Sequence, residues 1–239
     1  MDHLCLRSDF WLSDMLGYPA WRVEKGETGE PLSRLPTTEP YFAYAKLSVG
    51  EIAEVSQLAD AGFRVVDTAL TFKGKISGFA VDGIRFARAE DRDAVSRIAG
   101  TTFRFSRFHL DPLVPRAVAD AIKSAWAANF FAGKRGDGMV VTEREGRVVA
   151  FLQMLWTTPD NLTIDLIGVD PAWQRQGVGR DMIQFVSRHG TGDGRIPAVM
   201  TVGTQAANVA SVRLYESLGF RLSTAQYVLH LHGIVKSAE

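Results

Sequence analysis

The sequence predicts an α/β protein, and three observations lead to this prediction. Residues 162–189 read as a buried strand, a glycine-containing turn and an amphipathic helix. Two further segments, 58–66 and 215–223, each read as a helix, then Gly-Phe-Arg, then a strand. The 239 residues are 46% hydrophobic and 23% charged, which is ordinary for a globular protein. We therefore expect a sheet flanked by helices, in one large or two small domains.

The bulk composition excludes several classes of partner. The formal net charge is zero, which argues against a protein that binds nucleic acid or an anionic membrane through its overall charge. Cys5 is the only cysteine, so no intrachain disulfide forms and a cytoplasmic protein is expected. We find no signal-peptide pattern and no stretch apolar enough to span a bilayer. A homodimer is compatible with the sequence, but no pattern indicates an oligomeric state.

The first 82 residues are predicted to form a small α/β unit. Its expected elements are a loop at 26–40, a strand at 41–47, a helix at 51–61 and a strand at 63–72. Residues 73–82 contain glycines and little periodicity, which is typical of a linker. The shared helix–Gly-Phe-Arg–strand order makes the unit look like a partial repeat of the chain's last part. Joints of this kind also recur between unrelated folds, so the repeat is one of two interpretations.

Residues 83–239 are predicted to form the second and larger unit. Strands are expected at 83–89, 139–143, 147–156, 162–171, 198–202 and 226–231, with helices at 90–99, 118–131, 178–189 and 208–218. The acidic residues at 90–93 fall in the first turn of their helix, where the helix dipole favours negative charge. The unit therefore alternates strands and helices around the 162–189 stretch.

Residues 101–115 mix aromatic and charged side chains in a way that suits neither a core nor a solvated loop. Phe105, Arg107 and His109 are the substrate-binding candidates in this segment. An arginine pairs with phosphate in fork geometry, and a phenylalanine stacks on a base or sugar. A surface loop whose charges pair with one another explains the same composition equally well.

The turn after the strand at 162–171 carries the pattern Gln174-x-x-Gly177-x-Gly179. The first N–H groups of a helix have no intrahelical partner, and the helix dipole favours an anion there. Glycine lets the backbone come close to a bulky phosphate. Arg175 and Arg180 add side-chain donors, so we expect a pyrophosphate site. The pattern fits neither the dinucleotide fingerprint nor the P-loop.

This turn resembles the acetyl-CoA signature of the GNAT superfamily, and the strand before it ends in the typical Val169-x-Pro171. A second element, Asn208-x-x-Ala-x-x-x-Tyr215-x-x-x-Gly-Phe, resembles another GNAT motif. The resemblance implies a GNAT fold, a mixed sheet whose central strands splay apart, with acetyl-CoA as co-substrate. The cofactor-binding residues that it implies are Leu166, Ile167, Gly168, Val169, Gln174, Arg175, Gln176, Gly177, Val178, Gly179, Arg180, Asn208 and Tyr215.

The resemblance also suggests roles in acetyl transfer. Tyr215 matches the tyrosine that protonates the leaving thiolate in many GNAT enzymes, against the alternative of a packed core tyrosine. Asn208 is expected to cap its helix and contact CoA. Gly168 suits a bulge or a close backbone approach. Asp165 is the first candidate for the general base and His109 the second, although Asp165 also fits a solubilising role. His230 and His232 alternate on one strand face, but no partner spacing supports a metal site.

Across nearly the whole chain the sequence resembles the dTDP-fucosamine acetyltransferase family, through Phe10 to Tyr18, Leu58 to Phe63, Phe103 to Phe108 and the CoA motifs. That family acetylates the 4-amino group of a nucleotide-linked dideoxysugar, which implies a nucleotide amino sugar as partner and a place in polysaccharide biosynthesis. Two alternatives remain: acetylation of a protein or another small amine, and an acyl-CoA-binding module without turnover.

Overall fold

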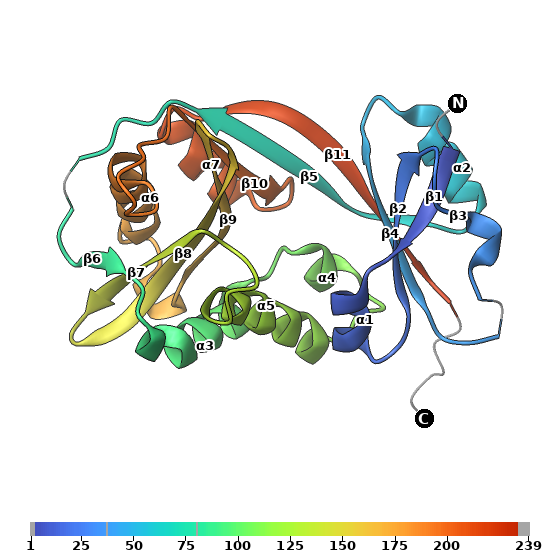
Figure 1. Ribbon diagram of the computed structural model, residues 1–239, viewed down its shortest axis with the longest axis horizontal. Coiled ribbons are helices and arrows are strands. Elements are labelled where there is room, and N and C mark those ends of the chain that lie inside the picture. Colours follow the sequence, from blue (N-terminus) through green and yellow to red (C-terminus); the bar gives the residue numbers. More distant parts are fainter. Residues whose placement is uncertain (1–2, 37, 80, 234–239) are drawn as a thin grey trace.

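The computed structural model describes residues 3–36, 38–79 and 81–233, which contain one eleven-stranded sheet (Figure 1). The strand order is β3-β1-β2-β4-β11-β5-β10-β9-β8-β7-β6. The strands are β1 (His3–Ser8), β2 (Ala20–Gly26), β3 (Glu30–Pro31), β4 (Phe42–Ser48), β5 (Arg64–Gly74), β6 (Ile84–Phe86), β7 (Gly138–Arg144), β8 (Arg147–Thr158), β9 (Asn161–Val169), β10 (Val199–Gln205) and β11 (Arg221–His232). The α-helices are α1 (Phe10–Leu16), α2 (Ile52–Asp60), α3 (Arg92–Thr102), α4 (Arg107–Leu110), α5 (Arg116–Phe131), α6 (Val178–His189) and α7 (Val209–Ser217). The predicted α/β class is confirmed.

Helices cover both faces of the β7–β9 part of the sheet because alternate residues of its strands are apolar. Val140 and Leu152 pack in one core with the apolar side of α6. Their neighbours Met139 and Phe151 pack in a second core with α3 and α5. Successive strand residues point to opposite faces, so these strands are apolar on both sides and the sheet is buried between two helical layers.

A β-bulge interrupts β9 at Asp165. Gln153 of β8 pairs with Leu166, whereas Met154 pairs with Ile164, so Asp165 has no direct partner. Because the extra residue shifts the side-chain alternation, Ile164 enters the core under α6 and Leu166 enters the core under α3 and α5.

The prediction of a bulge at Gly168 is wrong. Gly168 pairs with Phe151 in regular register. A Cβ at this glycine would lie 2.7 Å from Phe151 Cε1, so the missing side chain makes room for the phenylalanine ring. The close approach that the sequence indicated therefore concerns packing between two strands.

The strands of the N-terminal part continue the same sheet. Residues 69–74 of β5 pair with β10, and β5 also pairs along β11, whose end pairs with β4. Figure 1 shows β5 and β11 running side by side between the two ends of the molecule. The domain boundary at residue 82 stays a prediction. In the structure, β5, which precedes this boundary in the sequence, lies between β11 and β10, which follow it.

Helix α5 joins the two parts on the other side. Its Ala127 packs in the core of α3 and β8, while Ala119 and Ile122 pack with Leu12 of α1 and Phe42 of β4. This helix has 16 residues, and within the described ranges no helix is long and apolar enough to cross a membrane. A single amphipathic helix thus fixes the N-terminal part against the sheet.

Candidate active site

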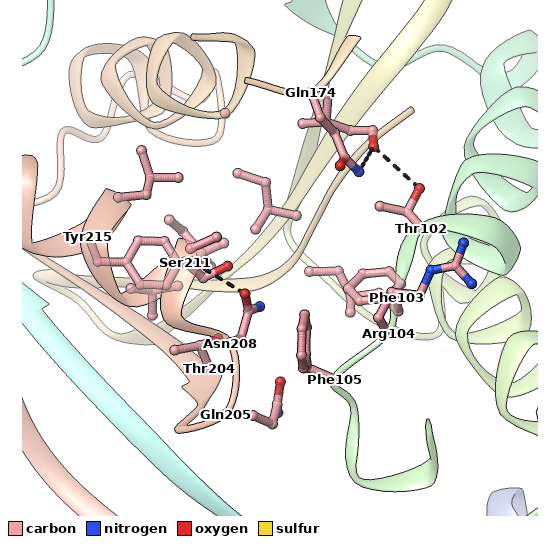
Figure 2. A pocket seen from close by; sticks show the side chains of 18 of the residues that line it. Thr102, Phe103, Arg104, Phe105, Gln174, Thr204, Gln205, Asn208, Ser211 and Tyr215 are labelled. Atoms are coloured by element: carbon pink, nitrogen blue, oxygen red, sulfur yellow. Dashed lines mark hydrogen bonds between the residues drawn. The ribbon is translucent and has the colours of Figure 1, made fainter. Parts of the chain in front are cut away.

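A cavity of about 520 Å³ opens where β9 and β10 separate. The two strands pair in parallel from Asn161 to Ile164, and the pairing ends at Ile164 with Val202. Beyond that point both strands line the cavity, together with residues 102–106, the start of α6 and α7. Figure 2 shows Phe103 and Phe105 across the cavity from Asn208 and Tyr215.

Most of the predicted cofactor-binding residues line this cavity: Leu166, Ile167, Val169, Gln174, Arg175, Gly177, Val178, Gly179, Arg180, Asn208 and Tyr215. Gly168 and Gln176 are outside its lining. Gly168 faces Phe151, and the Gln176 amide donates to the carbonyl of Ala172 at 3.1 Å.

The glycine turn places the start of α6 at the cavity wall. Gly177 is the N-cap of α6 and has φ 83° and ψ −9°, a left-handed conformation that favours glycine. The N–H groups of Val178, Gly179 and Arg180 belong to the first turn of this helix and have no intrahelical acceptor. Because these residues line the cavity, the helix start offers backbone donors and the positive end of a dipole to an anion.

The side chains of Gln174 and Arg180 bind protein groups next to the turn. The Gln174 amide donates to the carbonyl of Val169 at 3.0 Å. Thr102 Oγ1 donates to the same carbonyl at 3.4 Å, as Figure 2 shows. Arg180 donates to Ser217 Oγ at 2.8 Å. These contacts leave the backbone N–H groups at the start of α6 as the donors without a protein partner among the described residues, and the binding of a pyrophosphate, including donation by Gln174 and Arg180, stays a prediction.

Replacing Gly177 with valine is expected to weaken CoA binding at least about tenfold, because a left-handed β-branched residue costs roughly 1–3 kcal/mol and the turn would move. Isothermal titration with CoA measures the effect. Gly194 is the matched control, since it has φ 86° and open space around its Cβ position but lies outside the cavity lining. Gly194→Val should bind CoA as the wild type does. Unchanged affinity in Gly177→Val would show that phosphate is bound elsewhere.

Helix α7 brings Asn208 and Tyr215 to the same wall, as their seven-residue spacing predicts. The predicted cap is confirmed, because Asn208 Oδ1 accepts from the N–H of Ser211 at 3.3 Å. Tyr215 is 2% exposed and packs between Phe72 and Phe220. Burial raises the pKa of Tyr215 to about 12, although its hydrogen bond with Ser211 acts in the opposite direction. The phenol therefore keeps its proton at neutral pH.

Asp165 lies at the cavity, but other protein groups occupy its carboxylate. Arg135 binds both oxygens, at 2.6 Å through Nε and 2.5 Å through Nη2. Trp126 Nε1 donates to Oδ2 at 3.0 Å and the Gln153 amide at 3.2 Å. Four donor atoms already bind the carboxylate, so a substrate amine would have to displace one of them to reach it, and the structure disfavours Asp165 as the general base.

The segment at 101–115 is divided between the cavity and the interior. Phe105 lines the cavity as predicted, and so do Phe103 and Arg104. His109 does not, because its ring nitrogens contact Ser106 Oγ at 2.6 Å and Asp120 Oδ1 at 2.9 Å. With both nitrogens in use and the side chain 3% exposed, the predictions of His109 as substrate ligand and as base are not supported.

Arg107 also points away from the cavity. Its guanidinium lies 3.8 Å from the centroid of the Tyr44 ring and 4.2 Å from that of Phe108. Burial lowers the pKa of Arg107 to about 10, and nearby Tyr44 partly offsets this effect. The structure therefore does not support the predicted contact of Arg107 with phosphate; the side chain packs between α4 and β4 instead.

Arg107 ends in a buried polar network that sequence spacing did not reveal. Asp111 Oδ2 contacts His230 Nδ1 at 2.6 Å and His232 Nε2 at 2.7 Å, although the histidines follow Asp111 by more than a hundred residues. An aspartate with two histidines is also a common metal-ligand set. Arg107 Nη1, a donor, lies 3.2 Å from His230 Nε2, so the other nitrogen, Nδ1, carries the proton and donates it to Asp111.

The pair formed by Lys123 of α5, which lines the cavity, and Trp126, which binds the cavity residue Asp165, was not predicted. Their spacing of three residues places them on one helix face, which was the available signal.

Known proteins share this architecture and these motifs. Residues 103–220 match the family model of the acetyltransferase (GNAT) family. The chain is 29% identical over 142 residues to the spore coat polysaccharide biosynthesis protein SpsD of Bacillus subtilis. The matched region covers 59% of this chain and 47% of that protein. It is 32% identical over 101 residues to the ribosomal protein bS18-alanine N-acetyltransferase of Escherichia coli, covering 41% of this chain and 66% of that enzyme.

Each of these relatives is thus matched over less than two thirds of its length. Among solved structures, a GCN5-related N-acetyltransferase from Sphaerobacter thermophilus superposes with a TM-score of 0.55 at 15% identity, covering 85% of this chain and 64% of that one. This likeness confirms the predicted fold with its splayed central sheet. Members of the matched family use acetyl-CoA as co-substrate. The chain thus contains a domain of the GNAT acetyltransferase family at residues 103–220.

Proposed function

We propose that this protein transfers the acetyl group of acetyl-CoA to the amino group of a nucleotide-linked amino-dideoxysugar. The observation that carries the proposal is the cavity between β9 and β10, which joins the start of α6 to the buried hydroxyl-bearing Tyr215. One end suits the pyrophosphate of CoA, and the pantetheine arm then runs along the unpaired edge of β9 toward the bulge at Asp165.

The reaction proceeds by direct attack in a ternary complex. The neutral amine attacks the thioester carbonyl carbon, a C–N bond forms, and the C–S bond breaks as the thiolate leaves. Tyr215 donates its phenolic proton to the sulfur, and the amine proton returns through water to the phenolate. A backbone N–H of β9 beyond Ile164 is the proposed donor to the developing oxyanion. The chain's contribution is mainly to hold the reactants together and to supply this proton.

The similarity to SpsD, named for spore coat polysaccharide biosynthesis, supports a sugar acceptor. The aromatic side chains of Phe103 and Phe105 line the cavity and offer flat apolar faces to a sugar or base. A second candidate acceptor is a protein N-terminus, which the similarity to the bS18-alanine N-acetyltransferase supports.

A thiol-release assay with acetyl-CoA tests the proposal. The acceptor panel contains dTDP- and UDP-linked 4-amino-4,6-dideoxysugars, a peptide with N-terminal alanine and a lysine-bearing peptide. We expect turnover with a nucleotide amino sugar and background rates with both peptides. Turnover with the alanine peptide alone would favour the second candidate. Binding of acetyl-CoA without turnover on any acceptor would count against both.

A further inference from the structure

Lys123 is a cation on the cavity wall without a carboxylate of its own. Its side chain is half-buried and comes from α5. Nζ lies 4.9 Å from the centroid of the Phe103 ring and 4.9 Å from that of Trp126. Among the ion pairs of the described residues, none includes Lys123. Burying an ammonium group without a paired anion is unfavourable, so this arrangement indicates a missing partner.

Most of the charged groups around Lys123 are also positive. Burial and, to a smaller extent, the positive charges of Arg107, Lys46 and Arg135 together lower the pKa of Lys123 to about 8, although Asp165 acts in the opposite direction. Asp165 already binds Arg135 through both oxygens. The one nearby carboxylate is therefore shared with another cation, and this part of the wall carries net positive charge.

Lys123 lies near the bulge of β9 at Asp165. The Trp126 ring, which Nζ approaches, donates to Asp165 at the bulge of β9. Asp165 is near the beginning of the cavity-lining part of β9, whereas the glycine turn follows its end at Val169. The phosphates of CoA are expected at the turn, so they do not neutralise Lys123.

We infer that Lys123 binds a phosphate or diphosphate group of the acceptor. The inference rests on the proposed function, because it assigns the glycine turn to acetyl-CoA and the bulge end to the acceptor. An ammonium group binds a phosphate oxygen through a short charge-assisted hydrogen bond. The bound anion compensates the positive wall and positions the sugar so that its amine reaches the thioester carbon. Lys123 then makes the enzyme select amines that carry a phosphate group.

Steady-state kinetics with two acceptors tests the inference. One acceptor is a dTDP-linked 4-amino-4,6-dideoxysugar, and the other is the methyl glycoside of the same sugar, which has no phosphate. Lys123→Met is expected to raise KM for the dTDP sugar about ten- to a hundredfold, with kcat little changed and KM for the glycoside unchanged. Lys123→Arg keeps the charge and should stay within a few-fold of the wild type. Lys134→Met removes an exposed lysine near the end of α5 and serves as the control.

An equal fall of kcat on both acceptors would overturn the inference, because it would indicate a base or a structural role. Failure of Lys123→Arg to retain a low KM would do the same. If the wild type acetylates neither sugar, the proposed function fails. A binding measurement then tests the role of Lys123 separately from the proposed function. Titration of dTDP into CoA-saturated protein should then give a weaker Kd for Lys123→Met than for the wild type. Equal dTDP affinities would overturn the inference whatever the fate of the proposed function. The CoA affinity and the thermal midpoint of each variant show whether it is folded.

Discussion

Replacing Tyr215 with phenylalanine is expected to lower kcat about a hundredfold or more, since general acid catalysis typically contributes 10²–10⁴-fold. The substitution removes only the hydroxyl, and the ring keeps its packing between Phe72 and Phe220. The affinity for acetyl-CoA should therefore stay within a few-fold of the wild type. Because the pKa of Tyr215 is about 12, its acid form is present throughout the usual pH range.

The matched control for this experiment is Tyr41→Phe. Tyr41 is another buried tyrosine, 9% exposed, but it packs in the core between β1, β4 and α2. Its replacement should leave kcat unchanged in the thiol-release assay. If Tyr215→Phe also keeps the wild-type kcat, the leaving thiolate takes its proton from another group and Tyr215 is a packing residue.

The second large effect is expected on stability. Asp111→Asn should lower the free energy of unfolding by about 3 kcal/mol or more, because it removes the charge of a buried carboxylate that accepts from two histidines. Besides the bonds to His230 and His232, the N–H of Leu113 donates to Oδ1 at 2.9 Å. Asp111 is 3% exposed, so water does not replace these contacts. Urea unfolding monitored by tryptophan fluorescence measures the loss.

The pH dependence of this loss follows from the same network. Burial lowers the pKa of His230 to about 4, with Asp111 acting against the shift and Arg107 in favour of it. An unfolded histidine titrates near 6.5, so the unfolded state binds more protons between these values and stability falls as the pH drops from about 6.5 to 4. Burial acts against ionisation of Asp111, but the histidine hydrogen bonds outweigh it and hold its pKa well below its usual range. Its stabilising effect is thus lost last, in strong acid.

The wild type and Asp111→Asn should therefore keep their difference in stability from neutral pH down to about pH 4, the unfolded pKa of an aspartate, and converge only in stronger acid, where Asp111 is protonated. Asp120→Asn is the control, since Asp120 also binds a histidine but its side chain is 28% exposed. Breaking that half-exposed contact should cost only about 1 kcal/mol. If the two variants lose the same stability, the Asp111 network contributes no more than a surface contact.

Local patterns in the sequence, together with the family resemblance, were sufficient to predict residues that line one cavity at the glycine turn, β9 and α7. The strand before Pro171, the left-handed Gly177 and the Asn208–Tyr215 spacing all depend on neighbours within two helical turns. The rest of the site depends on distant contacts. Whether Asp165 is a free base or a bound anchor depends on Trp126 in α5 and on Arg135 in the loop after it.

The same limit explains the errors at 101–115 and β9. An arginine and a histidine among aromatic residues predict a polar pocket, but Arg107 finds aromatic rings of β4 and His109 finds Asp120. At Gly168 the sequence suggested either a close approach, which the packing of Phe151 shows, or a bulge. The bulge occurs at Asp165, where the pairing of β8 changes register, and no pattern within β9 itself signals that position.

The place of β11 has a consequence for how the protein is made. This strand lies between β4 and β5, yet it is synthesised after every other strand of the described sheet. While the chain grows on the ribosome, β4 and β5 both expose unpaired edges, which readily add strands from other chains. Pairing across so long a stretch of sequence is intrinsically slow. Nascent chains thus remain open to chaperones and to aggregation until β11 emerges and closes the sheet.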